Sequence, residues 1–269
     1  MGLASPIRSS RIIYFEISLQ FSSKLKKFTG DIIYITELVD TENAGSETMR
    51  LQSKTFVLLI LVFIILSFLV TVKATNNIDN LISNLFFQLG GDPSLDMFMI
   101  IVSSTGDLFT MVIVGMILTI IRRTRKIGLI FLISIVVISI SIMYIKPLVN
   151  RTSPLEQYIP QYHIPDNYMI ENDSMTPLSR DLSFPSNHVA RDTAFIIIIG
   201  YWFRFFKNKT WLGTLLWTFP GLIGLSRLYL LQNYFIDILG GAIYGIIIAI
   251  LLVKVLKLNE PFLANKFNK

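Results

Sequence analysis

The chain has 269 residues, of which 52% are hydrophobic and only 16% are charged, and its formal net charge is +6. Soluble domains usually carry about 25% charged residues, so this composition indicates an integral membrane protein. The sequence contains no cysteine, which excludes disulfides and zinc–thiolate sites, and its basic residues form no continuous patch of the kind that binds nucleic acid.

Residues 1–48 form a mixed, polar segment ahead of the first apolar run. The one apolar stretch in it is short and is broken by Glu16, so a signal peptide is not predicted. Because the segment is too short to bury a core, we expect a poorly ordered extension, or a translation start placed upstream of a true initiator at Met49. The predicted membrane domain covers residues 49–258, and residues 259–269 form a cytoplasmic tail.

Six apolar runs follow, and about 20 apolar residues are enough to cross a bilayer. The predicted spans are residues 55–72, 95–121, 127–145, 189–203, 211–225 and 234–253. Gly106 and Asp107 interrupt the second span, and residues 76–89 fit an amphipathic helix at the membrane interface. The predicted fold class is therefore all-α, a six-span transmembrane helical bundle. Gly240, Gly241 and Gly245 are small residues that let the last helix approach its neighbours closely.

Lysine and arginine residues gather in alternate loops of this six-span scheme. They lie before the first span, between the second and third, between the fourth and fifth, and after the sixth. The positive-inside rule makes that side cytoplasmic, together with both termini. Residues 146–188 and 226–233 then fall on the outer face, and both connections are rich in polar side chains.

Three polar clusters therefore share the outer face, in residues 146–154, 183–188 and 226–237. His188 lies in the first turn of a helix, where it could protonate a leaving oxygen, and Asp192 four residues later could orient it. A helix N-terminus also suits a phosphate group. The alternative is an interfacial histidine that only caps its helix.

The other two clusters carry charges that need a partner. Lys146 and Arg151 lie on the outer side against the positive-inside trend, which favours anion binding, with contact to lipid headgroups as the alternative. Asp237 lies inside the sixth span, where a carboxylate is costly, and Arg227 and Asn233 are its nearest candidate partners. The alternative here is a purely structural Arg–Asp pair.

The order and spacing of the three clusters resemble the membrane-bound type 2 phosphatidic acid phosphatases, which are related to vanadium haloperoxidases and bacterial acid phosphatases. The first family motif, Lys, six residues, Arg-Pro, is matched by residues 146–154, and the second, Pro-Ser-Gly-His, by residues 185–188. The third, Ser-Arg, five residues, His, three residues, Asp, is matched by Ser226, Arg227, position 233 and Asp237.

The resemblance implies an outward-facing phosphate site that needs no metal and no cofactor. Lys146 and Arg227 would bind phosphate oxygens, Ser186 and nearby backbone amides would add hydrogen bonds, and His188 would protonate the leaving alkoxide. The histidine of the third motif would attack phosphorus, held by the aspartate at the position of Asp237.

The sequence departs from the family at three positions. Position 233 is Asn233, whose amide is not a nucleophile, so a catalytically silent protein is one reading. Ser153 replaces the second cation of the first motif, and Arg151 is the candidate replacement. Asn187 stands where the family has glycine, so its side chain lies close to the expected phosphate. His163, in the outer connection, is an alternative attacking group, and attack by water with His188 as the base is another.

The predicted function is hydrolysis of a phospholipid or an isoprenyl (di)phosphate at the outer membrane face. The first alternative is a silent relative that binds a phosphorylated lipid, and the long connection over residues 147–184 would form a lid in either case. A small transporter is the second alternative. It would need polar residues deep in several spans, which only four residues approach: Asp107, Arg191, Asp192 and Asp237.

Overall fold

The computed structural model describes residues 46–158, 181–202 and 210–256, so residues 1–45 of the predicted polar extension, the C-terminal tail and His163 lie outside the described residues. The described part is all-helical, as the sequence predicts. Its helices are α2 (Ser46–Thr71), α3 (Asn76–Leu89), α4 (Pro93–Thr105), α5 (Leu108–Ile120), α6 (Arg125–Val149), α7 (Asn187–Trp202), α9 (Thr210–Tyr229) and α10 (Phe235–Val255), with a short 3₁₀ turn η1 (Pro154–Glu156).

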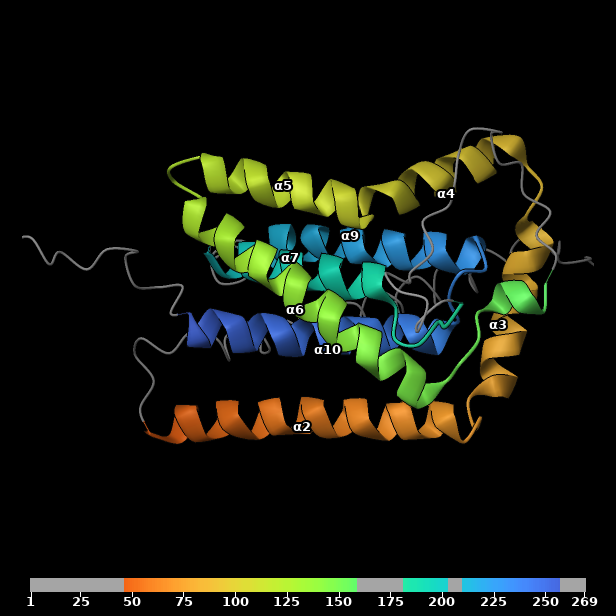
Figure 1. Ribbon diagram of the computed structural model, residues 1–269, viewed down its shortest axis with the longest axis horizontal. Coiled ribbons are helices and arrows are strands. Elements are labelled where there is room, and N and C mark those ends of the chain that lie inside the picture. The colour runs from red at the N-terminus through yellow and green to blue at the C-terminus, as the bar shows by residue number, and fades with distance from the viewer. Residues whose placement is uncertain (1–45, 159–180, 203–209, 257–269) are drawn as a thin grey trace, which may run out of the picture.

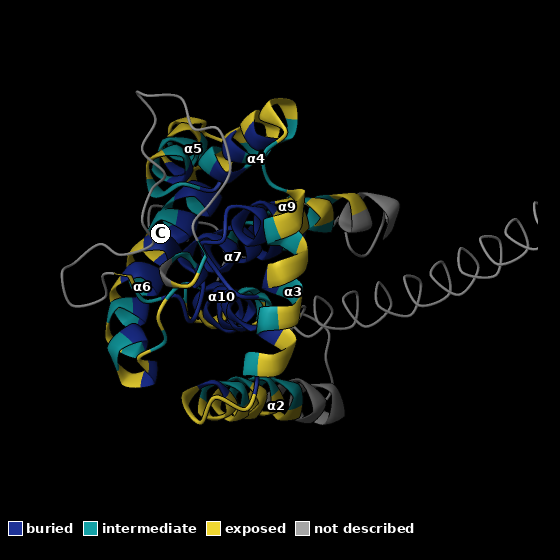
Figure 2. Ribbon diagram, turned by 90° about the vertical axis from the view of Figure 1, so that its right-hand side faces the viewer, coloured by how far each residue is buried: buried dark blue, intermediate teal, exposed yellow. Residues whose placement is uncertain are grey.

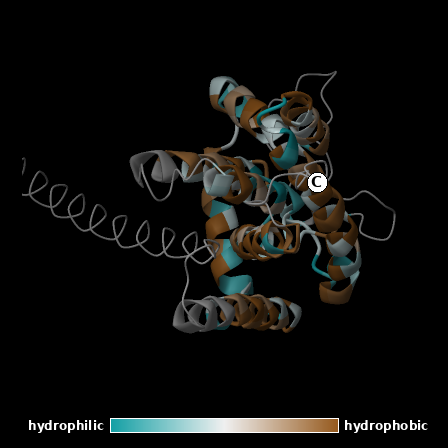
Figure 3. Cartoon of the chain, turned by 90° about the vertical axis from the view of Figure 1, so that its left-hand side faces the viewer, coloured by the Kyte–Doolittle hydropathy of each residue, from teal (hydrophilic) through white to brown (hydrophobic). Residues whose placement is uncertain are grey.

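The long helices run side by side along the molecule, and α3 crosses one end of them (Figure 1). Helices α7 and α10 lie at the centre and are mostly buried, whereas α2 lies at the edge (Figure 2). Most residues along the long helices are hydrophobic (Figure 3). Only 6% of the apolar part of α2, Lys54–Thr71, is buried in the protein, so this helix offers its side chains to lipid.

Three of the described helices are long and apolar enough to cross a membrane: α2, α6 and α10. A fourth crossing is obtained if α4 and α5 count as one span, since these two helices are separated by a short break and bent by 48°. The break lies at Gly106 and Asp107, where the sequence places a polar interruption. Helix α7 has 16 residues, which is less than the about 20 that span a bilayer, so the six-span count stays a prediction.

Glycines on α10 bring this helix close to α7 and to the segment before it, and the predicted close approach of two helices is confirmed at Gly245. A Cβ atom at Gly245 would lie 2.3 Å from the backbone oxygen of Ala190, and one at Gly241 would lie 2.5 Å from that of Ser186. At Gly240 a Cβ would lie 2.5 Å from the ring of Phe184. Helix α10 is thereby held against the N-terminal half of α7 and the segment before it.

Helix α3 is amphipathic, with its polar face turned toward the bundle. Asp79 and Ser83 are fully buried, whereas Ile78, Leu81 and Leu85 are exposed. An exposed apolar stripe at helical spacing fits a helix that lies in the membrane interface. The buried carboxylate of Asp79 reaches the polar cluster described next.

Candidate functional site

The three polar clusters predicted from the sequence come together at one end of the bundle, where α6 ends and α7 and α10 begin. The backbone N–H of Ser183 donates to Arg151 O at 2.8 Å, and that of Ser153 donates to Asp181 O at 3.0 Å. The N–H of Ser186 donates to Asp237 O at 3.1 Å. Backbone contacts thus join the first cluster to the second and the second to the third.

Lys146 lies in the last turn of α6, not beyond the helix end as the sequence suggested. The helix continues through Pro147 and stops at Asn150, whose left-handed backbone (φ 51) is a common way to end a helix. The Lys146 side chain is buried, and its Nζ donates to Leu182 O at 2.7 Å. The cation is thereby fixed on the segment that precedes His188.

Asn233 connects the second and third clusters through both atoms of its amide. Its Oδ1 accepts hydrogen bonds from Ser186 Oγ at 3.1 Å and from Arg227 Nε at 3.3 Å. Its Nδ2 donates to Ser183 O at 2.9 Å, so Asn233 and Lys146 bind adjacent carbonyl groups. The side chain is 1% exposed. It holds the site together, but an amide has no nucleophilic lone pair to offer phosphorus.

Arg151 forms ion pairs with two buried carboxylates. Its Nη1 donates to Asp237 Oδ1 at 2.8 Å and its Nη2 to Asp79 Oδ2 at 2.6 Å, while the guanidinium lies 4.0 Å from the centre of the Tyr234 ring. The prediction that Asp237 pairs with Arg227 or Asn233 is therefore wrong. Asp237 Oδ2 accepts instead from Tyr234 N at 2.8 Å, and Asp79 Oδ1 from Ile236 N at 3.1 Å. Both carboxylates bind the N-terminal turn of α10, where free N–H groups favour an anion.

His188 pairs with Asp107, the residue at the break between α4 and α5. The distance from His188 Nε2 to Asp107 Oδ1 is 2.8 Å, and the imidazole is fully buried. The sequence proposed Asp192 for this position, but Asp192 lies beside Gly106, where a Cβ would be 2.7 Å from Asp192 Oδ2. The bend puts Asp107 within reach of the start of α7, which sequence spacing does not reveal.

Three further residues predicted to belong to the site are also buried. Ser226 is buried, and its hydroxyl donates to Ile223 O at 2.7 Å within its own helix. Asn187 is the first residue of α7 and directly precedes His188 in the sequence, and its side chain is buried. Arg227, besides its bond to Asn233, donates from Nη1 to Ser103 Oγ at 3.3 Å. Ser103, Asp79 and Asp107 are the side chains that sequence reasoning did not assign to the site.

The site is closed in this structure. Six of its polar side chains are at most 1% exposed: Lys146, Ser186, His188, Arg227, Asn233 and Asp237. In such a water-poor region the charges interact more strongly than they would in water. An anion that enters must replace internal hydrogen bonds such as those of Lys146 and Ser186. Within the described ranges no cluster of three or more His, Cys, Asp or Glu side chains could hold a metal ion.

Comparison with protein families matches residues 127–261, half of the chain, to the PAP2 superfamily. The chain belongs to this superfamily. A comparison with curated proteins finds no match. Among solved structures, the chain is similar to the crystal structure of a transmembrane PAP2-type phosphatidylglycerolphosphate phosphatase from Bacillus subtilis. The TM-score is 0.58 and the sequence identity 22%, over 77% of this chain and 98% of that one, so the likeness shows the fold. The protein is a multi-pass, PAP2-type membrane protein related to lipid phosphate phosphatases.

Proposed function

We propose that the buried polar cluster binds the phosphate group of a phosphorylated lipid without forming a covalent intermediate. The observation that carries this proposal is the side chain at position 233. It is an amide in hydrogen-bond contact with both a serine and an arginine of the family motifs. Binding needs positive charge and donors, which remain, whereas nucleophilic attack needs a group that Asn233 lacks.

Four groups are proposed to contact the phosphate oxygens. Lys146 and Arg227 supply two buried positive charges, and Ser186 supplies a hydroxyl donor. The first N–H groups of α7, which begins at Asn187, supply the helix end that favours an anion. On binding, Lys146 Nζ would exchange Leu182 O for a phosphate oxygen, and Ser186 would exchange Asn233 Oδ1 in the same way. Arg151 is assigned to holding Asp79 and Asp237, so it is not among the phosphate ligands.

The site is proposed to face the outer side of the membrane in a six-span topology. The basic connections support this orientation, since Arg122 and Arg123 lie between α5 and α6, at the end of α6 opposite to Lys146. In this arrangement α4 and α5 form one broken span, α7 crosses within the protein, and α9 crosses with Leu215, Leu222 and Leu225 exposed to lipid. The lipid tails would lie along exposed helices such as α2.

Hydrolysis is a second candidate, favoured by the pair of His188 and Asp107. If a water oxygen attacks phosphorus, His188 can take its proton on Nδ1, because Nε2 faces the Asp107 carboxylate. The P–O bond to the lipid then breaks, and the imidazolium returns the proton to the leaving alkoxide, giving inorganic phosphate and a lipid alcohol. Asp107 would stabilise the imidazolium between the two steps.

The experiment compares binding with turnover for the full chain purified in detergent. Phosphate release is measured from phosphatidic acid and from an isoprenyl diphosphate, for the wild type and for His188→Ala. Binding of phosphatidic acid is measured by native mass spectrometry. We expect binding by both proteins and no release above background. Release by the wild type that disappears in His188→Ala would establish hydrolysis and refute the silent binder, and a failure of both proteins to bind would refute the phosphate site itself.

A further inference from the structure

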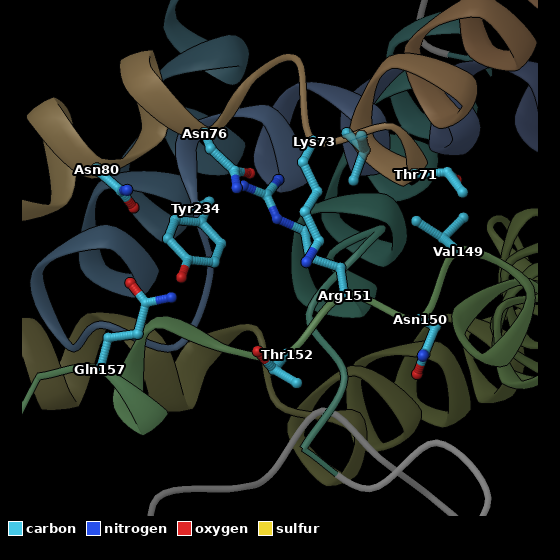
Figure 4. A pocket seen from close by; sticks show the side chains of 11 residues that line it. Thr71, Lys73, Asn76, Asn80, Val149, Asn150, Arg151, Thr152, Gln157 and Tyr234 are labelled. Carbon is cyan, nitrogen blue, oxygen red and sulfur yellow. The ribbon is translucent and has the colours of Figure 1, made fainter.

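A pocket opens beside the buried site, between the C-terminal ends of α2 and α6 and the start of α3 (Figure 4). Its volume is ≈ 320 Å³. Sites for small molecules usually measure about 300–1,000 Å³, so this one fits a small group and not an acyl chain. Arg151 and Tyr234 form the wall that it shares with the site. Lys146 and Arg227 do not line it.

The lining of the pocket is mainly polar and rich in side-chain amides. Asn76 and Asn80 enter from α3, and Gln157 enters from the turn after η1. Figure 4 shows Asn80 and Gln157 near the Tyr234 ring. Each amide can donate to one oxygen and accept from a hydroxyl, which suits a group that carries both phosphate oxygens and hydroxyls.

Lys73 supplies a positive charge at this pocket. It lies in the connection between α2 and α3 with a left-handed backbone (φ 59), a conformation that residues other than glycine seldom adopt. Its N–H donates to Val70 O at 2.9 Å, which fixes the turn. The side chain is exposed and forms no ion pair with any residue that the structure describes, in contrast to Arg151. Its charge is therefore available to an anion in the pocket.

Exposed apolar side chains lie elsewhere on α2 and α3, the helices that bring Val70, Thr71, Asn76 and Asn80 to the pocket. Phe68 and Val72 near the end of α2 are 63% and 51% exposed, and Ile78 and Leu81 on α3 are 57% and 61% exposed. A molecule could place its polar end among the polar side chains of the pocket and remove its apolar part from water against these exposed residues. A free polyol phosphate would use the pocket alone.

We propose that this pocket binds the headgroup of an anionic phospholipid, with Lys73 contacting the phosphodiester and the amides contacting headgroup hydroxyls. The acyl chains lie against α2 and α3. This lipid is a neighbour of the buried site and not its occupant, so the proposal does not depend on whether the buried site binds or hydrolyses phosphate monoesters.

The test uses a lipid that has a phosphodiester and no phosphate monoester. The full chain in detergent is titrated with short-chain phosphatidylglycerol, with phosphatidylcholine of the same chain length, and with glycerophosphoglycerol, the deacylated headgroup. Bound lipid is counted by native mass spectrometry. Lys73→Gln should raise the Kd for phosphatidylglycerol about tenfold, the loss expected for one charge-assisted contact. Lys54→Gln, an exposed lysine at the opposite end of α2, should leave it unchanged.

The other outcomes overturn the proposal in distinguishable ways. An unchanged Kd in Lys73→Gln, or an equal change in Lys54→Gln, removes the pocket as the binding place. Phosphatidylcholine bound as tightly as phosphatidylglycerol removes the preference for an anion. Glycerophosphoglycerol bound as tightly as the lipid assigns the pocket to a soluble polyol phosphate. In Arg227→Gln, phosphatidylglycerol binding should persist while phosphatidic acid binding falls, which separates this pocket from the buried site.

Discussion

The hydroxyl of Ser186 donates a hydrogen bond to the amide oxygen of Asn233 at 3.1 Å, between residues 47 positions apart in the sequence. Ser186 belongs to the second motif of the family and Asn233 to the third. The amide thus lies where the resemblance expects an imidazole, in contact with a serine that is expected to bind phosphate. Nucleophilic attack at this site therefore depends on the side chain at position 233, whereas the positive charge supplied by Lys146 and Arg227 does not.

Asn233→His is expected to give the protein phosphatase activity. A histidine at this position can attack phosphorus and form a covalent intermediate, the step that Asn233 cannot perform. Loss of a nucleophile typically lowers kcat by several orders of magnitude, so the gain in phosphate release should be about 10³-fold or more. Release of phosphate from phosphatidic acid, measured for the purified variant and the wild type, checks it.

Two controls make this result specific. Gln232→His places an imidazole at the neighbouring buried position and should give no activity. The double variant Asn233→His with His188→Ala should lose what Asn233→His gained, since the leaving group then lacks its acid. A wild type that already releases phosphate as fast as Asn233→His would contradict the assignment of position 233.

Arg227→Gln is expected to weaken binding of phosphatidic acid by more than about tenfold, because a charge-assisted contact contributes about 1.5–3 kcal/mol. Arg227→Lys keeps the charge but loses the planar guanidinium that bonds to both Asn233 and Ser103. Its affinity for phosphatidic acid should therefore lie between that of the wild type and that of Arg227→Gln. Binding is measured by native mass spectrometry. Arg122→Gln, at an exposed position in the α5–α6 connection, is the matched control. Equal affinity in Arg227→Gln and wild type would remove Arg227 from the phosphate ligands.

Sequence spacing was enough to predict that the three clusters meet, because helix ends on one side of a bundle are neighbours. It was not enough to predict which charges pair. The spacing predicts that Arg151 binds phosphate, yet it binds Asp237 and Asp79, since the left-handed end of α6 turns its side chain toward α10. The direction of a side chain beyond a helix end depends on backbone angles that spacing does not give.

The two missed carboxylates show a second limit. Asp79 was part of an amphipathic pattern, and such a pattern leaves open whether the polar face meets water or a polar site in the protein. Here it meets the site, 157 positions from its backbone partner Ile236. Asp107 was recognised as an interruption, but its partner His188 follows from the 48° bend between α4 and α5. The size of that bend depends on packing and not on local sequence.

Arg151→Gln is expected to destabilise the protein by about 3–5 kcal/mol, because it leaves two buried carboxylates without their cation. Adding Asp79→Asn should recover part of that loss, since only one of the two charges then remains. The free energy of unfolding in detergent is measured for both single variants and the double variant. Arg123→Gln, at an exposed position, should change it by less than about 0.5 kcal/mol. A double variant that is no more stable than Arg151→Gln would show that the two carboxylates do not act together.

The proposed orientation can be tested by labelling, since the chain contains no cysteine of its own. Thr152→Cys lies at the site end of the bundle and Arg123→Cys at the opposite end, and both positions are exposed. The positive-inside rule places Arg123 in the cytoplasm. A membrane-impermeant maleimide added to intact cells should therefore label Thr152→Cys alone, and both variants after lysis. Labelling of Arg123→Cys in intact cells would reverse the orientation or refute the six-span count.

The contact between α7 and α10 predicts opposite effects for two similar substitutions. Gly245→Ala would place a Cβ 2.3 Å from Ala190 O, a backbone atom that cannot move aside by rotation. Overpacking of this kind costs about 1–3 kcal/mol, so the melting temperature in detergent should fall. Gly221→Ala, on α9, meets nothing within 4 Å, and replacing a helical glycine with alanine can gain up to about 1 kcal/mol. Its melting temperature should therefore stay the same or rise.

The same pair of substitutions tests whether the α7–α10 contact positions the site. Because α7 begins next to His188, Gly245→Ala should lower the activity gained in Asn233→His, whereas Gly221→Ala should not. Equal effects of the two substitutions on this activity would show that the α7–α10 contact does not position the site.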